Sequence, residues 1–391
     1  MTDPAAAAAA APIVDRVRRR LASSGVLPTR SAVAGLVREE SGGLIGDAHL
    51  LRLVREAEDE MGGAGAVEPL LRDPDITDVL VNGPDEVWID RGGGLERVAV
   101  RFADDAAVRR LATRLAAAAG RRLDDAAPWV DASLPDGTRL HAILPPVSVG
   151  ATRLSLRVLR PRAFSLDDLV SAGTVTEQSR LLLTDIVRGR LAFLVSGGTG
   201  SGKTTLLSTL LSLVDPTERI VLVEDASELR PRHPHVVRLV ARPPNVEGTG
   251  QVSLQDLVRQ ALRMRPDRLI VGETRGAEVA DLLAAMNTGH EGGAGTVHAN
   301  SAAEVPTRLE ALGALAGLSR SAIQGQLVAA VDAVVHLRRD RAGVRRVHEI
   351  GLLRREVDGV AVLPAWRSDR TECEAGPRLR AMLAERLAGA W

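Results

Sequence analysis

One run of the sequence has the residue types and spacing of a phosphate-binding loop. It matches the pattern G-x-x-x-x-G-K-[ST] and consists of Gly197, Gly198, Thr199, Gly200, Ser201, Gly202, Lys203 and Thr204, with Thr205 following. An apolar run at 191–196 precedes it and a helical pattern follows it, so backbone N–H groups and the positive end of a helix should converge there. In such a loop Lys203 reaches the outer phosphates of a nucleotide and the Thr204 hydroxyl holds Mg²⁺.

Lys203 also stands out by composition. The chain has 50 basic residues, and Lys203 is the only lysine among them. A compact ammonium group on a flexible stem and a planar guanidinium do not substitute for each other in a narrow site. We therefore expect Lys203 to have a chemical role that arginine cannot take.

Two apolar runs that are expected to be buried strands end in carboxylates. The first ends at Glu224 and Asp225, and the second is followed by Glu273. Because ligands bind at the carboxyl ends of strands in an open parallel sheet, these acids should lie beside the phosphate loop. Transfer of a phosphoryl group to water needs a residue that orients the water, and we assign that role to Glu273. Two alternatives stay open: Glu224 and Asp225 could form a solvated turn, and Glu273 could pair structurally with Arg275.

Two histidines lie in glycine-rich segments farther along the chain. His290 and His298 are eight positions apart, a spacing that fits no helical metal motif. We expect them to sense the γ-phosphate or to position the carboxylates. Structural hydrogen bonding and metal binding are the alternatives.

The pattern of apolar residues divides the 391 residues into three parts. Residues 1–60 have helical periodicity, and residues 61–160 combine short strands with one helix at 106–119, as in an α+β domain. After a proline-containing linker at 160–165, residues 161–391 alternate apolar strands with helices. This alternation predicts an α/β domain with a mostly parallel sheet covered by helices on both faces.

Composition excludes several classes of protein. With 50 basic residues, 50 acidic residues and 2% aromatic residues, no stable nucleic-acid binding is expected. A single cysteine, Cys373, excludes an internal disulfide framework and a multi-cysteine zinc site, and it favours the reducing cytoplasm. Uncharged runs such as 191–202 and 321–331 are shorter than the ~20 residues that span a bilayer, so no integral membrane segment is expected.

Three further runs, 238–248, 261–268 and 286–290, carry a resemblance to a known family. Together with the phosphate loop, the acids and the histidines, they resemble the ATPases of type II/IV secretion systems. The similarity is greatest to the CpaF-like ATPases that assemble tight-adherence (Flp) pili, and it covers residues 66–355. The resemblance implies a RecA-like P-loop ATPase domain that binds ATP and Mg²⁺, preceded by a smaller α+β domain and a helical extension.

The resemblance also implies residues that act from the N-terminal domain. In the family this domain supplies arginines to the nucleotide, and the matching positions are Arg139, Arg153 and Arg157. The alternative for these arginines is an exposed basic strand face. Gly272 stands where the ordinary second nucleotide motif has its Asp, a feature that resembles the family. The basic stretch 230–235 is less similar to the family, and we expect a solvated loop there.

The function that the resemblance implies is a hexameric motor on the cytoplasmic face of the membrane. Such a homo-hexamer hydrolyses ATP to power pilus assembly or protein secretion, and its partner is a polytopic inner-membrane platform protein. The first alternative is a conjugal-transfer type IV secretion ATPase or nucleic-acid translocase, which DNA-stimulated hydrolysis would support. The second is a non-catalytic nucleotide-binding scaffold, against which the acids Glu224, Asp225 and Glu273 argue.

Overall fold

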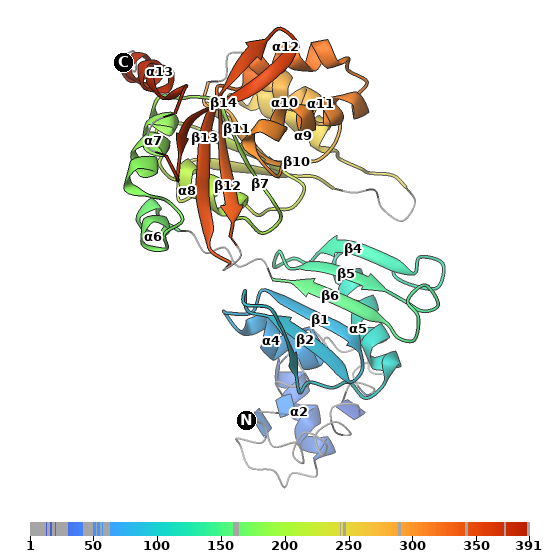
Figure 1. Cartoon of the computed structure of the whole chain (residues 1–391). Coiled ribbons are helices and arrows are strands. Elements are labelled where there is room, and N and C mark those ends of the chain that lie inside the picture. The colour runs from blue at the N-terminus through green and yellow to red at the C-terminus, as the bar shows by residue number, and fades with distance from the viewer. Residues whose placement is uncertain are drawn as a thin grey trace. The chain divides into compact units, whose positions relative to one another are not determined.

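The computed structural model in Figure 1 divides the chain into two compact units, residues 1–160 and 161–391. It describes residues 13, 16, 17, 20, 30–41, 50, 51, 53, 54, 57, 63–158, 164–242, 244, 248–287, 291–340, 343–370 and 373–388. A separate domain at residues 1–60 stays a prediction, as do the other two domain boundaries. None of the helices in the described ranges combines the length and the apolar character needed to cross a bilayer.

The first unit contains a six-stranded antiparallel sheet of order β3-β2-β1-β6-β5-β4. Its strands are β1 (Asp78–Gly83), β2 (Glu86–Asp90), β3 (Leu95–Val98), β4 (Trp129–Ser133), β5 (Arg139–Ile143) and β6 (Arg153–Arg157). The helices of this unit whose bounds lie within the described residues are α2 (Arg30–Glu40), α4 (Glu68–Arg72) and α5 (Asp105–Ala118), with a 3-10 turn at Gly65–Val67.

One strand of this sheet begins earlier than the sequence predicts. The apolar run 98–100 predicts a strand at those positions, whereas the strand in the structure, β3, spans Leu95–Val98. The cause is a tight glycine turn, in which Asp90 Oδ1 accepts hydrogen bonds from the backbone N–H groups of Gly92 (2.6 Å) and Gly94 (3.2 Å). Both glycines have positive φ, so the chain reverses over few residues and pairing resumes at Leu95.

One face of this sheet is buried and the other is open. Side chains alternate between the two faces, and the buried set, which includes Val79, Val81, Leu140 and Leu156, packs against α5. The opposite face keeps charged residues. A separate small apolar cluster around Val33 and other described N-terminal residues packs on α2.

The second unit contains an eight-stranded sheet of order β14-β13-β12-β7-β11-β10-β8-β9. Strands β7 to β12 are parallel to one another. Strand β13 pairs with β12 in antiparallel orientation, and β14 pairs with β13 in antiparallel orientation. The strands are β7 (Phe193–Gly197), β8 (Ile220–Glu224), β9 (Val236–Val240), β10 (Arg268–Thr274), β11 (Ala294–His298), β12 (Ala333–Arg339), β13 (Arg345–Glu356) and β14 (Gly359–Arg367). The stretch 230–235 before β9 has neither helix nor strand.

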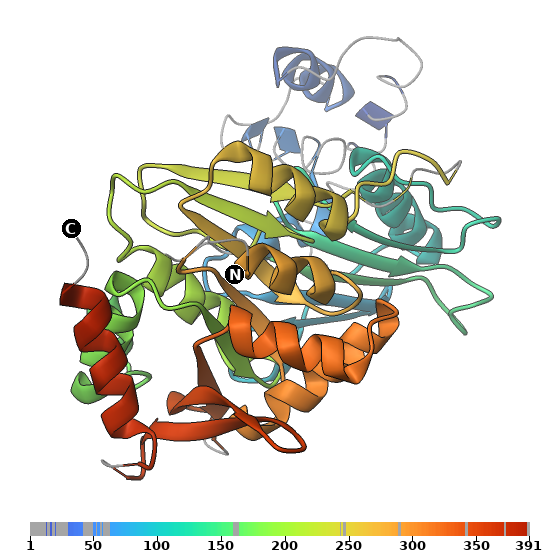
Figure 2. The ribbon, with the colours of Figure 1, turned by 90° about the horizontal axis from the view of Figure 1, so that it is seen from above.

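Helices cover both faces of this sheet (Figure 1, Figure 2). One layer contains α6 (Leu166–Ser171), α7 (Glu177–Arg188), α8 (Lys203–Leu211) and α13 (Gly376–Ala388). The other contains α9 (Leu254–Ala261), α10 (Val279–Met286), α11 (Val305–Leu315) and α12 (Arg320–Ala330). Within β7, Phe193 and Val195 belong to the first core and Leu194 to the second, so the strand is buried on both sides. The unit is the mostly parallel α/β domain that the sequence predicts.

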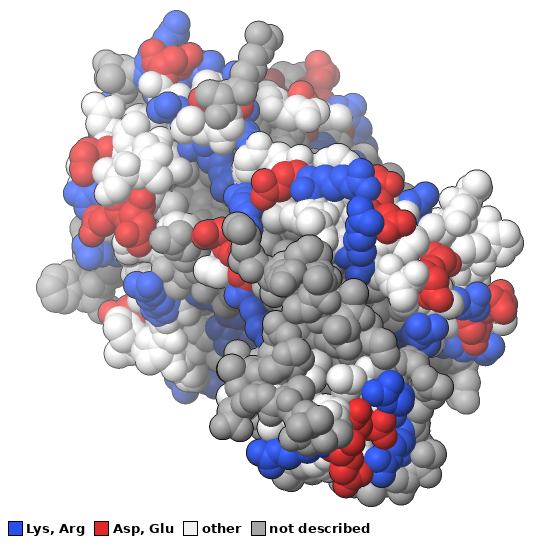
Figure 3. All heavy atoms as spheres, turned by 90° about the horizontal axis from the view of Figure 1, so that it is seen from below, with Lys and Arg blue, Asp and Glu red and all other residues white. Residues whose placement is uncertain are grey.

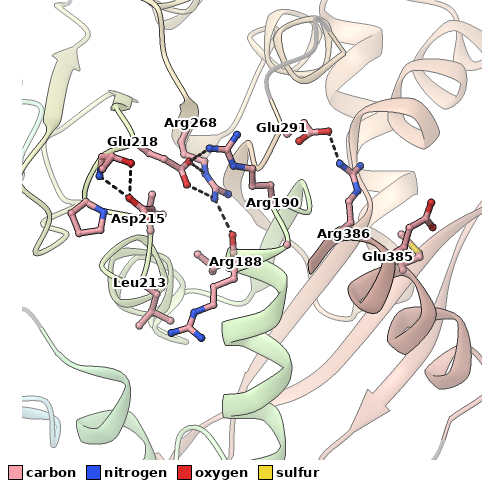
Figure 4. A pocket seen from close by; sticks show the side chains of 15 residues that line it. Arg188, Arg190, Leu213, Asp215, Glu218, Arg268, Glu291, Glu385 and Arg386 are labelled. Carbon is pink, nitrogen blue, oxygen red and sulfur yellow. Dashed lines mark hydrogen bonds and ion pairs between the residues drawn. The ribbon is translucent and has the colours of Figure 1, made fainter. Parts of the chain in front are cut away.

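A buried ion pair fixes the amino ends of the parallel strands. Arg268, which is 2% exposed, donates from Nε to Glu218 Oε2 (2.7 Å) and from Nη2 to Glu218 Oε1 (3.2 Å) and to the Val187 carbonyl (3.0 Å). Figure 4 shows the pair in the wall of a pocket of about 1290 Å³, where Arg386 also contacts Glu291. This pocket lies at the amino ends of the parallel strands, whereas the phosphate loop follows the carboxyl end of β7. Its charged groups largely pair with one another, which indicates a structural role.

We predict that Glu218→Gln destabilises the protein by about 3 kcal/mol, because it leaves the Arg268 guanidinium buried without a charged partner. Glu177→Gln is the matched control. Glu177 pairs with Arg180 on the surface, where such pairs contribute less than about 1 kcal/mol. Denaturant unfolding of the two variants measures the difference, and equal stabilities would contradict a structural role for the buried pair.

Candidate active site

The phosphate loop joins β7 to α8 through two glycines that other residues could not replace without strain. Gly200 (φ +69°) and Gly202 (φ +95°) are left-handed, and Gly202 caps the N-terminus of α8. A Cβ at Gly197 would lie 2.6 Å from Ser201 Oγ and 2.7 Å from the Leu337 carbonyl oxygen, so the loop is closely folded. The first N–H groups of α8 have no carbonyl partners within the helix, and the positive end of its dipole is at the loop. This geometry favours an anion.

Lys203 extends into this loop. Its Nζ donates to the carbonyl oxygens of Gly197 (3.1 Å) and Gly198 (3.2 Å), and its side chain is 9% exposed. Burial lowers the pKa of Lys203, and the nearby Glu273 carboxylate opposes that shift. The ammonium group is therefore the cation enclosed by the loop.

Glu273 lies beside the loop at the end of β10. Its Oε1 is 4.0 Å from Lys203 Nζ, and its Oε2 accepts from Arg275 Nε at 2.7 Å and also contacts Arg275 Nη2. The pairing with Arg275 is thus present together with the contact to Lys203. A carboxylate here can accept a proton from water or orient it.

Glu224 is buried at the end of β8, whereas Asp225 is exposed. Glu224 Oε1 accepts from the backbone N–H groups of Glu228 (2.9 Å) and Leu229 (2.8 Å), and burial raises the pKa of the carboxyl group. A solvated turn therefore does not describe Glu224. A Cβ at Gly272 would lie only 2.8 Å from Glu224 Cγ, which explains why glycine stands where the ordinary motif has an aspartate.

The Thr204 hydroxyl contacts Glu228, an acid that follows Glu224 and Asp225 closely in the sequence. Thr204 Oγ1 donates to Glu228 Oε2 at 3.5 Å. The signal for Glu228 was its place four residues after the end of β8. Hydroxyl and carboxylate oxygens are ligands that Mg²⁺ prefers, so the donor set fits this ion.

His298, at the end of β11, contacts the phosphate loop directly. Its Nδ1 is 3.3 Å from the Gly197 carbonyl oxygen and its Nε2 is 3.4 Å from Thr199 Oγ1. Burial lowers the pKa of His298, and this network fits a neutral ring that donates from Nδ1 and accepts at Nε2. His290 lies outside the described residues. Within the described ranges, no three His, Cys, Asp or Glu side chains are grouped so as to hold a metal ion.

His336 is a further residue at this site that the sequence analysis missed. It lies on β12, is 3% exposed, and its Nδ1 is 2.9 Å from Oγ of Ser196, the residue before the loop. Burial lowers the pKa of His336 to about 4. The only local signal was a polar residue within the apolar run of β12. The Ser196–His336 contact anchors the start of the phosphate loop to the neighbouring strand.

We predict that protonation of His336 lowers the free energy of unfolding as the pH decreases. The pKa of His336 is about 4 in the folded chain and 6.5 in the unfolded chain. The contribution of the neutral side chain to the free energy of unfolding is therefore fully present above pH 6.5 and declines as the pH falls below that value. Between about pH 7 and about pH 5 the loss from this group is about 2 kcal/mol. Denaturant midpoints of wild type and His336→Gln measure it. An identical pH dependence in the two proteins would contradict a buried neutral histidine.

Arg139, Arg153 and Arg157 lie on one face of the sheet in the first unit. Arg139 and Arg157 are register partners on adjacent strands, and Arg153 shares the face because it is four residues from Arg157 on β6. Arg157 Nε pairs with Asp78 Oδ1 at 2.9 Å. Arg153 Nη2 donates to the Val149 carbonyl oxygen at 3.4 Å. That these arginines reach a nucleotide stays a prediction.

A model of the type II/IV secretion system protein family matches residues 60–383. The chain belongs to this family. A putative conjugal transfer protein of Mycobacterium tuberculosis is 57% identical over 349 residues, which are 88% of this chain and 99% of the relative. The conjugal transfer protein TrbB of Rhizobium radiobacter is 34% identical over 304 residues, which are 76% of this chain and 90% of TrbB.

Solved structures agree on the fold. The crystal structure of the pilus retraction motor PilT with bound ADP has a TM-score of 0.50, covers 80% of this chain and 83% of PilT, and is 18% identical. This likeness supports the fold alone. The predicted RecA-like P-loop domain, preceded by a smaller domain, is confirmed. The CpaF-like subtype stays a prediction.

Proposed function

We propose that this chain hydrolyses ATP and acts as a hexameric motor on the cytoplasmic face of a membrane. The observation that carries the proposal is the closed loop around Lys203, with the Glu273 carboxylate 4.0 Å from its ammonium group. Lys203 and the N–H groups of the loop bind the phosphates, and Glu273 orients the attacking water. His298 contacts Gly197 and Thr199 and so keeps the loop next to the carboxyl end of β11.

Mg²⁺ fits the same site. Thr204 would hold it, with the Glu228 carboxylate next to that hydroxyl. Mg²⁺ keeps several waters and binds through one or two protein oxygens together with substrate phosphates. When bound, it neutralises charge on the phosphate oxygens.

Two uses of the motor are supported. The motifs favour assembly of a pilus or secretion of protein through a polytopic inner-membrane platform protein. The names of the two relatives favour a conjugal-transfer type IV secretion ATPase. Direct translocation of nucleic acid has less support, since basic and acidic side chains are interspersed on the face in Figure 3 and the net charge is zero.

The test is ATP hydrolysis by the purified full chain with Mg²⁺, measured against protein concentration and with light scattering. If Arg139, Arg153 and Arg157 act on a nucleotide within a ring, specific activity should rise as hexamers form. Full specific activity in a monomer would contradict the proposed hexameric ring. The absence of hydrolysis at every protein concentration would contradict the proposed ATPase activity.

The place of action has a separate test. Expressed alone, the chain should stay in the soluble fraction, and co-expression with its polytopic membrane partner should move it to membranes. Resistance of the isolated chain to alkaline extraction from lipid would contradict a peripheral motor. Stimulation of hydrolysis by DNA would favour the nucleic-acid translocase instead.

A further inference from the structure

The hairpin formed by β12 and β13 runs beside the phosphate loop. Leu337 on β12 is the register partner of Gly197, the last residue of β7. Beyond this point β12 continues to Arg339, and β13 returns from Arg345 in antiparallel register. The end of the hairpin therefore lies next to the glycines that follow β7.

Alternation along the two strands separates four arginines into two pairs. Leu337 and Val347 are register partners in the core that contains α8, the helix that leaves the loop. Arg339 and Arg345 are also partners, two residues farther on, and so they share this face. The partners Arg338 and Arg346 lie on the opposite face.

The first pair contacts the loop. Arg345 Nε donates to the Gly200 carbonyl oxygen at 2.9 Å, and a Cβ at Gly202 would lie 3.3 Å from Arg345 Cδ. A Cβ at Gly200 would lie 3.8 Å from Arg339 Nη1. Arg339 itself is held by a hydrogen bond from its Nε to the Gly343 carbonyl oxygen at 3.3 Å. Two guanidinium groups thus lie against the outside of the loop.

The contact with Gly200 sets the direction of a peptide group. In a trans peptide the C=O and the next N–H point in opposite directions. When Arg345 holds the Gly200 carbonyl outward, the N–H of Ser201 is turned inward, where it meets the Gly198 carbonyl oxygen at 3.3 Å. The peptide group between Gly200 and Ser201 is thus held at both ends, by Arg345 at its carbonyl oxygen and by the Gly198 carbonyl oxygen at its N–H, and these two contacts fix the shape of the loop around Lys203.

We propose that Arg345 is a positioning residue that holds the phosphate loop in its anion-binding form. Arg339 beside it adds positive charge to the same flank of the loop. The inference rests on the proposed function, because it assigns a further residue to the same nucleotide site. A hydrogen bond from a charged donor contributes on the order of 1.5 kcal/mol, which corresponds to about tenfold in affinity.

The experiment measures the Kd of the full chain for fluorescent ADP and ATP analogues, together with KM and kcat. Arg345→Ala should raise Kd and KM about tenfold, leave kcat within about twofold and lower the melting temperature by no more than about 5 °C. Arg345→Gln should recover part of the affinity, since its amide can still donate to the Gly200 carbonyl. Arg339→Ala should raise Kd by a smaller factor, about threefold.

Arg338→Ala and Arg346→Ala are the matched controls, because they remove the same charge from the other face of the same hairpin. They should keep the wild-type Kd. Equal affinities of Arg345→Ala and Arg346→Ala, in a chain that binds and hydrolyses ATP, would overturn the inference and leave the proposed function intact. If the wild-type chain binds ADP but does not hydrolyse ATP, the proposed function is wrong. In that case a higher Kd of Arg345→Ala for the ADP analogue would still support the positioning role of Arg345.

Discussion

Lys203→Ala is expected to weaken ATP binding and to lower hydrolysis about a thousandfold, which corresponds to about 4 kcal/mol of transition-state stabilisation. Lys203 is the cation enclosed by the loop, and its ammonium group is held by the carbonyl oxygens of Gly197 and Gly198. Without it, the phosphates would meet backbone dipoles but no positive charge inside the loop. Binding of a fluorescent ATP analogue and steady-state turnover measure the two losses separately.

Two further variants make this result specific. Lys203→Arg should fail as well, because the planar guanidinium is wider than the ammonium group and the side chain at this position is 9% exposed. Arg188→Ala removes an exposed cation from the end of α7 and should leave turnover unchanged. Substantial hydrolysis by Lys203→Arg would show that charge alone is sufficient.

The sequence predicts the loop and its supporting strands because the signals are local. A glycine pattern, one lysine and a strand-to-helix change all lie within a short segment, and β7, β8, β10 and β11 are apolar runs. The strands at the edge of the sheet or next to it are harder to predict from the sequence. β9 is only partly buried, and β13 begins and ends with arginine or glutamate, so neither has the continuous apolar pattern of a central strand.

Two residues of the site, His336 and Arg345, depend on contacts between distant parts of the chain. His336 and Ser196 are 140 residues apart, and Arg345 and Gly200 are 145 residues apart. Both contacts exist because β12 pairs with β7, a choice of neighbour that no local pattern specifies. The β12 to β13 segment carries arginines on both faces, so its alternation alone does not identify the arginines that lie against the phosphate loop.

Glu273→Gln is expected to bind ATP with near wild-type affinity and to lower hydrolysis at least about a hundredfold. The substitution keeps the size of the side chain and leaves Lys203 and the loop in place, while the amide cannot take a proton from water. The alternative role for Glu273 is to hold Arg275, and Arg275→Ala separates the two.

If Glu273 orients water, Arg275→Ala frees the carboxylate from its ion pair and should keep turnover within a few-fold of wild type. If Glu273 serves only to hold Arg275, the two variants should lose turnover equally and the double variant should lose no more than either. Single-turnover hydrolysis at saturating ATP compares the three proteins after binding has been equalised. Wild-type turnover in Glu273→Gln would remove this residue from the role of water activator, because no other change in that variant could restore the lost proton acceptor.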